Sequence, residues 1–483
     1  MQRPLGRAYR ASMRSPVRAT LLLCTALAAC GDDTSASASA GGTMITTAQP
    51  TAEPSTTTPV PTTGGDGLTG SGTGTGSEDS GAPTGPGESE SDTGVKLDLG
   101  VPDGELACGC EFSYVWVANA SEGTVSKINM DTLEEEARYL TRADAQGNPS
   151  RTSVSLRGDV AVANRHGGLV KFHADIANCK DTNGTPGIQT STGKDDVLPW
   201  DEEECRAWYV DFPTTNQRPV AWTQGKVMPG GCNTTDEKIW TVMSEKKSLL
   251  PGLGAPGGVI VALVDGETGN IDKQLTIPTF SGDSFGAYGG AVNTHGDLFF
   301  TSMAFNGGHL ARVYIDNFAF KVWVIPPDIG PYGITVDHKG QVWLSSVAIN
   351  TNGVGRFDPE VEKWDFVSGF GSGAGLAEGP NNWMWVSSYM GVNSVHIDTL
   401  ELGPIFKTDY QIKGLGFDDE GFMWAVNYAA TDENMNQIEP DVVMKIDPEA
   451  LTVVGEYDGL DHPYTYSDFT GNALFNVTCV PPQ

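Results

Sequence analysis

The sequence predicts an all-β protein, and the first observation behind this prediction is the stretch Gly330–Val367. It holds four short runs in which apolar and polar residues alternate, separated by turn residues, as half-buried antiparallel strands do. The second observation is that similar units recur at Tyr288–Val324, Leu376–Lys407 and Leu415–Tyr457. The third is a regular spacing of 44, 42 and 39 residues between the large aromatic residues of these units, Phe299, Trp343, Trp385 and Trp424.

A repeat of about 40–50 residues with four strands per unit is typical of a β-propeller. Further units begin at Tyr114, Ser153 and Lys238, and the first of them lacks an inner strand. Residues Pro463–Asp468 align with the strand Pro331–Val336, and a C-terminal strand there would cover the open sheet edge. We therefore predict an all-β β-propeller with seven four-stranded blades, closed by a C-terminal strand joining blade one. Six or eight blades are the alternatives, because a long insertion hides one blade boundary.

The N-terminus has the composition of a secretory signal. Residues 1–29 hold five arginines and the apolar run Ala19–Ala29, which is too short to span a bilayer. Leu27-Ala28-Ala29-Cys30 has the form of a bacterial lipobox, so we expect cleavage before Cys30 and lipid attachment to its thiol. The competing interpretation is an ordinary signal peptide with a chance cysteine. Met13 is an alternative start, because it would give a more compact charged region.

A low-complexity segment follows the signal. Residues 30–105 consist almost entirely of Gly, Ser, Thr, Pro, Ala and acidic residues. With so few large apolar side chains they cannot offset their ordering entropy. We expect a disordered tether that, as a coil of ~75 residues at ~5–6 Å × √n, holds the domain roughly 50 Å from its lipid. The β-propeller then occupies residues 106–483, with a Cys-containing acidic insertion at residues 176–237.

The chain is strongly acidic, with 30 Lys and Arg against 61 Asp and Glu and a formal net charge of −31 at pH 7. Removing residues 1–29 would remove five positive charges and no negative ones, which gives −36. Such a charge repels nucleic acid and anionic lipid, and no other apolar run approaches 18 residues. We therefore expect no nucleic-acid partner, a monomer, and a membrane association only through the lipid at Cys30. The expected location is the cell envelope, at the outer membrane, its periplasmic face or the cell surface.

Six cysteines follow the lipobox. An even number in an exported protein predicts three disulfides, with 15 possible connectivities. Within the insertion we expect a Cys179–Cys205 bridge, and at ring closure a bridge from Cys479 to Cys108 or Cys110. Zinc is the competing interpretation, although the Cys-x-Cys spacing is not the usual one for a metal site. The six residues are Cys108, Cys110, Cys179, Cys205, Cys232 and Cys479.

The insertion contains a partial calcium-loop pattern over residues 181–204. Oxygen-bearing side chains stand at the first, third and fifth positions, as the first ligands of such a loop do. The sixth position is proline rather than glycine and the twelfth is not acidic, so a carboxylate would have to come from further along the chain. A weak Ca²⁺ site and a solvated acidic loop without an ion are the two alternatives. The candidate ligands are Asp181, Asn183, Thr185, Asp195 and Asp196.

One repeat unit carries a family motif, at Pro331–Ile334, Asp337, Gly340, Val342-Trp343 and Gly353–Pro359. This motif resembles a blade of the streptogramin B (virginiamycin B) lyase family. The first unit, with Val115–Asn119 and Val125–Ile128, is more similar to the related NHL and YVTN propellers. The resemblance covers roughly residues 110–480 and is strongest between residues 287 and 458.

The resemblance implies a seven-bladed fold and, for the lyases, a magnesium-dependent elimination that opens the ester ring of the antibiotic. That chemistry needs a histidine base and carboxylates on the metal. Here Tyr332 stands where the motif has its histidine, and serine or asparagine stands where it has glutamate. We therefore expect a non-catalytic module that binds a small ligand or a cell-envelope protein. The alternative is a lyase-like, metal-dependent C–O lyase with a rearranged site.

Small polar residues at the ends of the second strands are the candidate ligand-binding residues, because those ends would line one face of the ring. Of the seven histidines, His462 beside Asp461 is the only one that we retain as a candidate catalytic residue. His295 and His338 are expected to be exposed turn residues. The candidate ring-face residues are Asn119, Thr301, Ser302, Ser345, Ser346, Ser387, Ser388 and Asn427.

Overall fold

The computed structural model describes residues 113–214, 216–227, 234–244, 258–280, 285–303, 307–346, 353–369, 373–388, 391–428, 437 and 439–479. The predictions made for the signal peptide, the tether and Cys30, Cys108, Cys110 and Cys232 lie outside the described residues. Within the described ranges, no helix is long and apolar enough to cross a membrane.

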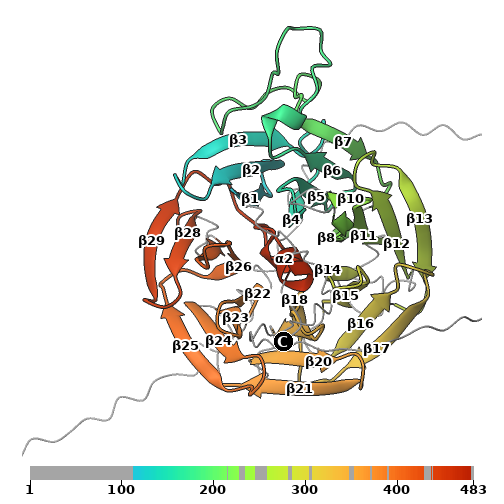
Figure 1. Cartoon of the computed structure of the whole chain (residues 1–483), viewed down its shortest axis with the longest axis vertical. Helices are drawn as coiled ribbons and strands as arrows, with labels where there is room; N and C mark the ends of the chain where they lie inside the picture. Colours follow the sequence, from blue (N-terminus) through green and yellow to red (C-terminus); the bar gives the residue numbers. More distant parts are fainter. Residues whose placement is uncertain are drawn as a thin grey trace, which may run out of the picture. The chain divides into compact units, whose positions relative to one another are not determined.

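The described residues form a β-propeller, as predicted (Figure 1). Six antiparallel sheets of four strands and one of three surround a central axis. The three-stranded sheet is blade one, with β1 (Tyr114–Asn119), β2 (Thr124–Asn129) and β3 (Glu135–Leu140). Blades two to four contain β4 (Pro149–Val154), β5 (Val160–Asn164), β6 (Leu169–Phe172) and β7 (Arg206–Val210); β8 (Asn216–Trp222), β11 (Lys238–Ser244), β12 (Val259–Asp265) and β13 (Ile271–Ile277); and β14 (Ala287–Val292), β15 (Leu298–Ser302), β16 (Gly308–Val313) and β17 (Phe320–Ile325). Blades five to seven contain β18 (Pro331–Val336), β19 (Val342–Ser346), β20 (Gly353–Asp358) and β21 (Lys363–Ser368); β22 (Leu376–Gly379), β23 (Trp383–Ser388), β24 (Gly391–His396) and β25 (Leu402–Lys407); and β26 (Ile412–Phe417), β27 (Met423–Asn427), β28 (Val443–Asp447) and β29 (Thr452–Tyr457).

The predicted aromatic anchors are buried at the centres of their blades. Trp343 and Trp424 are fully buried, and each donates its indole N–H over 2.8 Å to a carboxylate in the preceding turn, that of Asp337 or Asp418. Burial raises the pKa of Asp337 to about 6. The repeated Asp and Trp six residues apart is therefore one unit of structure, in which the turn carboxylate satisfies a buried indole.

Blade one is closed by the C-terminal segment, as predicted. Asn119 at the end of β1 forms an antiparallel bridge with Pro463. The N–H of Tyr464 then donates to the carbonyl of Ala118 over 3.0 Å, and further along β1 the N–H of Trp116 donates to residue 469 over 2.9 Å. The inner edge of β1 is thus covered by residues 463–469, which removes the free sheet edge of an open ring.

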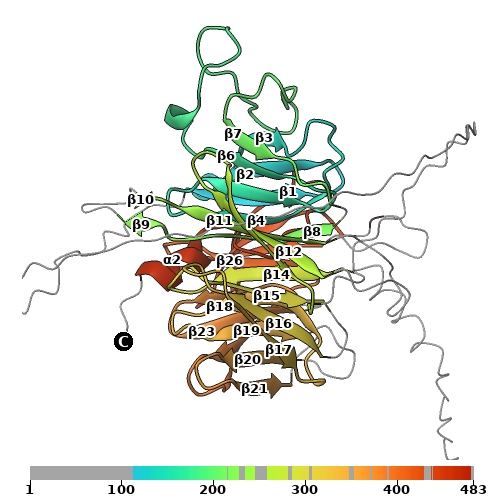
Figure 2. The same cartoon turned by 90° about the vertical axis from the view of Figure 1, so that its right-hand side faces the viewer.

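The closing segment is shorter than the predicted 463–478, because it turns into the helix α2 (Asn472–Cys479). The Asp468 carboxylate begins this helix by accepting the N–H groups of Gly471 (2.8 Å) and Leu474 (3.2 Å). Figures 1 and 2 together place α2 close to the axis at one end of the ring, on the side that also carries the β9–β10 hairpin (Lys226–Val227 and Thr234–Thr235).

The segment 176–237, predicted as one insertion, is divided in the structure. Only residues 176–205 leave the propeller, as the short helix η1 (Ile176–Asn178) and a loop tied by the predicted Cys179–Cys205 disulfide. Strands β7 and β8 then form the outer strand of blade two and the inner strand of blade three. Their alternation is interrupted by arginine and tryptophan, which is why the sequence pattern placed the blade boundary too late.

Candidate functional site

The inner strands all begin at the end of the channel opposite α2, and bulges there reorient their first side chains. The pairing register shifts by one residue near the start of β4, β14, β18 and β26, and within β8. A β-bulge turns a side chain away from its regular direction. The residues at or beside these bulges are Arg151, Arg218, Tyr288, Tyr332 and Lys413.

Four tyrosines form a buried cluster at this end of the channel. Tyr288 and Tyr332 come from β14 and β18, and Tyr464 and Tyr466 come from the closing segment. The hydroxyl of Tyr464 lies 2.9 Å from that of Tyr288 and 2.8 Å from that of Tyr332, so three phenols share a hydrogen-bond network. Their rings are at most 4% exposed. Ring closure therefore completes the cluster, because Tyr464 and Tyr466 belong to the closing segment.

Four cationic side chains lie against these rings. The Arg151 guanidinium is 3.3 Å from the centroid of Tyr466, and that of Arg165 is 4.1 Å from Tyr464. Arg218 lies 5.0 Å from the ring of Tyr288. Lys413 lies 5.3 Å from the ring of Tyr332. All four cations are buried, and stacking on aromatic faces stabilises each of them in part.

The cations change the acidity of the central phenol. Burial by itself would raise the pKa of Tyr464, but the surrounding charges of Arg165, Lys413, Arg218 and Arg151 lower it to about 8. Burial raises the pKa of the neighbouring Tyr466. The site thus has a positive potential that favours negative charge at Tyr464. Strongly perturbed groups gathered in one place are typical of functional sites.

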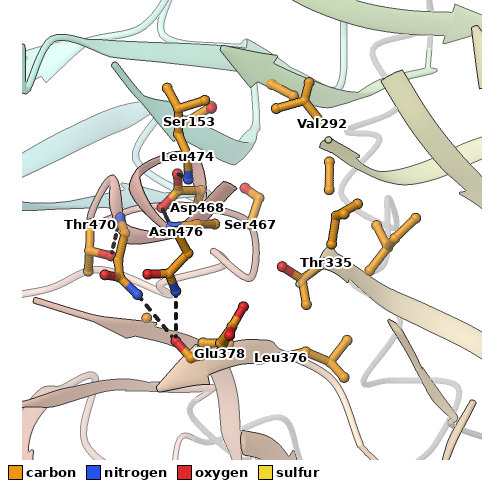
Figure 3. A pocket seen from close by; sticks show the side chains of 18 of the residues that line it. Ser153, Val292, Thr335, Leu376, Glu378, Ser467, Asp468, Thr470, Leu474 and Asn476 are labelled. Atoms are coloured by element: carbon orange, nitrogen blue, oxygen red, sulfur yellow. Dashed lines mark hydrogen bonds between the residues drawn. The ribbon is translucent and has the colours of Figure 1, made fainter. Parts of the chain in front are cut away.

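At the opposite end of the channel α2 lies close to the axis (Figure 1), and Figure 3 shows side chains that line the cavity there. The cavity between α2 and the ends of the inner strands has a volume of about 40 Å³, which is room for a few water molecules but too small for an organic ligand. Asp468 and Glu378 line it. The side chains of Asn472 and Asn476 donate to the Glu378 carbonyl over 3.2 and 3.3 Å, so the helix is fixed across the opening.

The predicted ring-face residues do lie at the cationic end of the channel, but their side chains bond to neighbouring backbone. Ser345 donates to the Ala374 carbonyl over 2.6 Å, and the oxygen of Asn427 accepts the Val442 N–H over 2.8 Å. Equivalent bonds hold the other members, so these residues have a structural role in joining strand ends. The remaining residues of this set are Asn119, Thr301, Ser302, Ser346, Ser387 and Ser388.

The two histidines of interest lie at opposite ends of the channel. His462 precedes the closing segment at the cationic end, is half-exposed, and has its Nδ1 3.6 Å from the Asp461 carboxylate. His338 is not the exposed turn residue that was predicted. Its side chain is buried against Glu378 of the next blade, and the hydrogen bond to Glu378 raises the pKa of the imidazole.

The candidate calcium ligands lie in a loop that the Glu204 carboxylate organises. This carboxylate accepts the backbone N–H groups of Thr182 (2.6 Å), Asn183 (2.9 Å) and Gln189 (2.9 Å). Asp181 accepts the N–H of Gly187 over 3.3 Å. Among the residues that the structure describes, no group of three or more His, Cys, Asp or Glu side chains is placed to hold a metal ion. The other candidates, Thr185, Asp195 and Asp196, lie in the same loop.

Sequence reasoning missed Arg151, Arg165 and Arg218. A signal for two of them was present, since Arg151 and Arg218 stand near the start of an inner strand, as Tyr288 and Tyr332 do. The alternation of apolar and polar residues assigns such residues to a strand, but it does not predict the bulge that changes the direction of their side chains. Arg165 follows β5 and reaches the cluster only through the folded ring.

Comparison with solved structures finds propeller proteins at low sequence identity. A protein of unknown function from Desulfotomaculum acetoxidans is 12% identical with a TM-score of 0.49, covering 72% of this chain and 96% of its own. Virginiamycin B lyase from Staphylococcus aureus is 15% identical with a TM-score of 0.41, covering 64% and 83%. A streptogramin B lyase is 13% identical with a TM-score of 0.43, covering 65% and 91%. Identities this low concern the fold alone. No protein-family profile and no curated protein matches the chain.

Proposed function

We propose that this protein is a ligand-binding module of the bacterial cell envelope, without catalytic activity of its own. The observation that carries the proposal is the gathering of buried cationic and aromatic side chains at the channel end opposite α2. Buried cations that bulges turn toward one axis destabilise a fold unless a ligand uses them. The ligand would therefore bind at the cationic end, where the inner strands begin, while α2 keeps the other end closed.

The location in the envelope rests on the lipobox and the low-complexity segment. In this proposal the lipid at Cys30 anchors the chain, and residues 30–105 let the propeller reach ligands away from the membrane surface. Cys30→Ser is expected to move the protein from the membrane fraction to the soluble fraction of the cell. Unchanged fractionation of this variant would contradict the lipid anchor.

The magnesium chemistry of the lyase family does not fit the residues at this site. Tyr332 replaces the histidine of the motif, and serines such as Ser346 and Ser388 replace its glutamates. Serine hydroxyls are poor substitutes for the carboxylates that Mg²⁺ prefers. In addition, the buried cations Arg151, Arg165 and Arg218 would repel a divalent ion.

A lyase with a rearranged site is the alternative function, and one observation favours it. Tyr464 has its pKa lowered to about 8, so this phenol is a better general base at neutral pH than an ordinary tyrosine. The test is to incubate the full chain with a streptogramin B and Mg²⁺ and to follow ring opening by mass. We expect no turnover. Ring opening that is abolished by Tyr464→Phe would establish the alternative instead.

A further inference from the structure

The arginines of the site differ from the other buried arginine of the propeller in their partners. Arg138 is 2% exposed and pairs with the carboxylates of Glu135 and Glu122 at 2.8 and 3.0 Å. Arg151, Arg165 and Arg218 are 0%, 5% and 3% exposed, and within the described ranges none of them pairs with a carboxylate. Leaving a guanidinium buried without a counter-charge costs several kcal/mol. At the cationic end of the channel, three guanidinium groups are buried in this way.

Each of the three guanidinium groups is fixed by hydrogen bonds at one part of its fork. Arg165 donates through Nη1 to the side-chain oxygen of Asn148. Arg218 donates through Nε to the side-chain oxygen of Asn216 over 3.0 Å. Arg151 donates through Nη1 and Nη2 to the carbonyls of residues 150 (2.9 Å) and 288 (3.1 Å). The groups are therefore held in place before any ligand arrives, which lowers the entropic cost of binding.

Four other N–H-bearing nitrogens of these arginines have no acceptor within the part of the chain that the structure describes. They are Nε of Arg151, Nη1 of Arg218, and both Nε and Nη2 of Arg165. The last two lie on one edge of a single planar guanidinium. Two parallel N–H donors on one edge match the two oxygens of a carboxylate, phosphate or sulfate.

The three arginines also point at one small region. Arg151 and Arg218 lie 4.9 and 5.0 Å from the same ring, that of Tyr288. Arg165 faces the ring of Tyr464, whose hydroxyl is 2.9 Å from the hydroxyl of Tyr288. One oxyanion among them could therefore accept from more than one arginine.

We propose that Arg151, Arg165 and Arg218 bind the oxyanion group of a ligand, with Arg165 contributing its Nε–Nη2 edge as a bidentate pair. This inference rests on the proposed binding function and specifies its ligand as a molecule bearing a carboxylate, phosphate or sulfate. The neighbouring phenol rings are buried, and a low local dielectric strengthens each charge-assisted hydrogen bond.

Titration of the central phenol is consistent with this chemistry. Burial opposes ionisation of Tyr464, yet Arg165, Lys413, Arg218 and Arg151 together lower its pKa to about 8. The uncharged groups that face it are Tyr288, Tyr332 and Tyr466. A site that favours a phenolate also favours an exogenous oxyanion.

The test measures the melting temperature and calorimetric binding of the full chain with sodium benzoate, inorganic phosphate or inorganic sulfate. Sodium chloride at equal ionic strength is the reference. At least one oxyanion is expected to bind saturably and raise the melting temperature, and the strongest of the three identifies the source of the group. Arg165→Lys keeps the charge but removes the bidentate edge, and is expected to weaken binding at least tenfold. Arg165→Met should abolish it.

The control is Arg356→Met, which removes a guanidinium paired with Asp365 on the outer strands and should leave oxyanion binding unchanged. Full binding by both Arg165 variants, or an equal response to chloride, would overturn the oxyanion assignment. If Arg165→Met fails to fold, Arg165→Lys decides by the same measure. A neutral probe, N-acetylglucosamine, separates the two proposals. If it binds in an Arg165-dependent way and the oxyanions do not, the binding function stands and the oxyanion assignment fails.

Discussion

The two ends of the channel are built from the same inner strands, yet their charged side chains differ in how far their hydrogen-bonding groups are satisfied. At the α2 end, the carboxylate of Asp468 accepts N–H groups of the helix, and that of Glu378 pairs with His338. At the other end, Arg151 and Arg165 are more deeply buried, yet each has an N–H donor without an acceptor among the residues that the structure describes.

This difference separates structure from function within one fold. Charged groups that serve stability are satisfied inside the protein, because an unsatisfied buried group costs free energy. In the proposed function, the unsatisfied charged groups serve a ligand, and the fold bears the cost. The comparison predicts that removing a charged group satisfied inside the protein lowers stability, whereas removing an unsatisfied arginine of the cationic end does not.

Removing the closing segment should have the largest effect. A chain truncated after Asp461 loses residues 463–469 and α2, so the edge of β1 is exposed and the tyrosine cluster loses Tyr464 and Tyr466. We expect aggregation rather than a folded monomer. Size-exclusion chromatography and circular dichroism measure this, with a chain ending after Cys479 as the control. A monomeric, fully folded truncation would show that the ring does not depend on this closure.

Replacing paired and unpaired arginines should give effects of opposite sign. Arg138→Met leaves Glu135 buried without its partner, so we expect a loss of about 3–5 kcal/mol in the free energy of unfolding. Arg165→Met removes a buried cation that has no carboxylate partner, so we expect the free energy of unfolding to be unchanged or raised by up to about 4 kcal/mol. Equilibrium unfolding in urea at pH 7 measures both. Equal destabilisation by the two variants would contradict the comparison.

A substitution that weakens the packing of α2 should lower the free energy of unfolding and leave binding at the cationic end unchanged. Leu474 is 2% exposed in the helix, and Leu474→Ala is expected to lower the free energy of unfolding by about 2–5 kcal/mol. The exposed Lys180→Ala serves as the control and should change it by less than about 0.5 kcal/mol. Oxyanion binding by Leu474→Ala should equal that of the unmodified chain. If it does not, the two ends are coupled.

The smallest effect concerns pH. Because the pKa of Tyr464 is lowered to about 8 in the folded chain from an ordinary value near 10, its ionisation stabilises the fold above pH 10. This contribution, on the order of 2 kcal/mol, is lost as the pH falls through 8. Tyr464→Phe should remove the rise in stability between pH 8 and 10, measured by urea unfolding. An unchanged rise in this variant would assign it to another group.

The pH dependence of oxyanion binding provides a second test of the ionisation of Tyr464. A bound oxyanion and the Tyr464 phenolate compete for the same cations, so oxyanion affinity should fall as the pH rises above about 8. In Tyr464→Phe this fall should disappear, while binding at pH 7 is retained. Calorimetric titration at pH 7 and pH 9 measures both.

The repeat pattern of the sequence was sufficient for the fold. The alternating runs, the spacing of the large aromatic residues and the alignment of Pro463–Asp468 with Pro331–Val336 are sequence signals, because strand faces and turns depend on neighbouring residues. They predicted the blades, the ring closure and the Cys179–Cys205 disulfide.

The candidate site was decided only by tertiary structure. Arg151, Arg165 and Arg218 come from separate positions in two blades, and the strand pattern alone does not show that they gather in one place. Bulges turn two of them toward the axis, and the C-terminal segment brings Tyr464 against them from the far end of the chain. Burial and the lack of a carboxylate partner are properties of the closed ring. For that reason the sequence determined where the strands lie, whereas only the folded ring determined which buried charges remain without a carboxylate partner among the described residues.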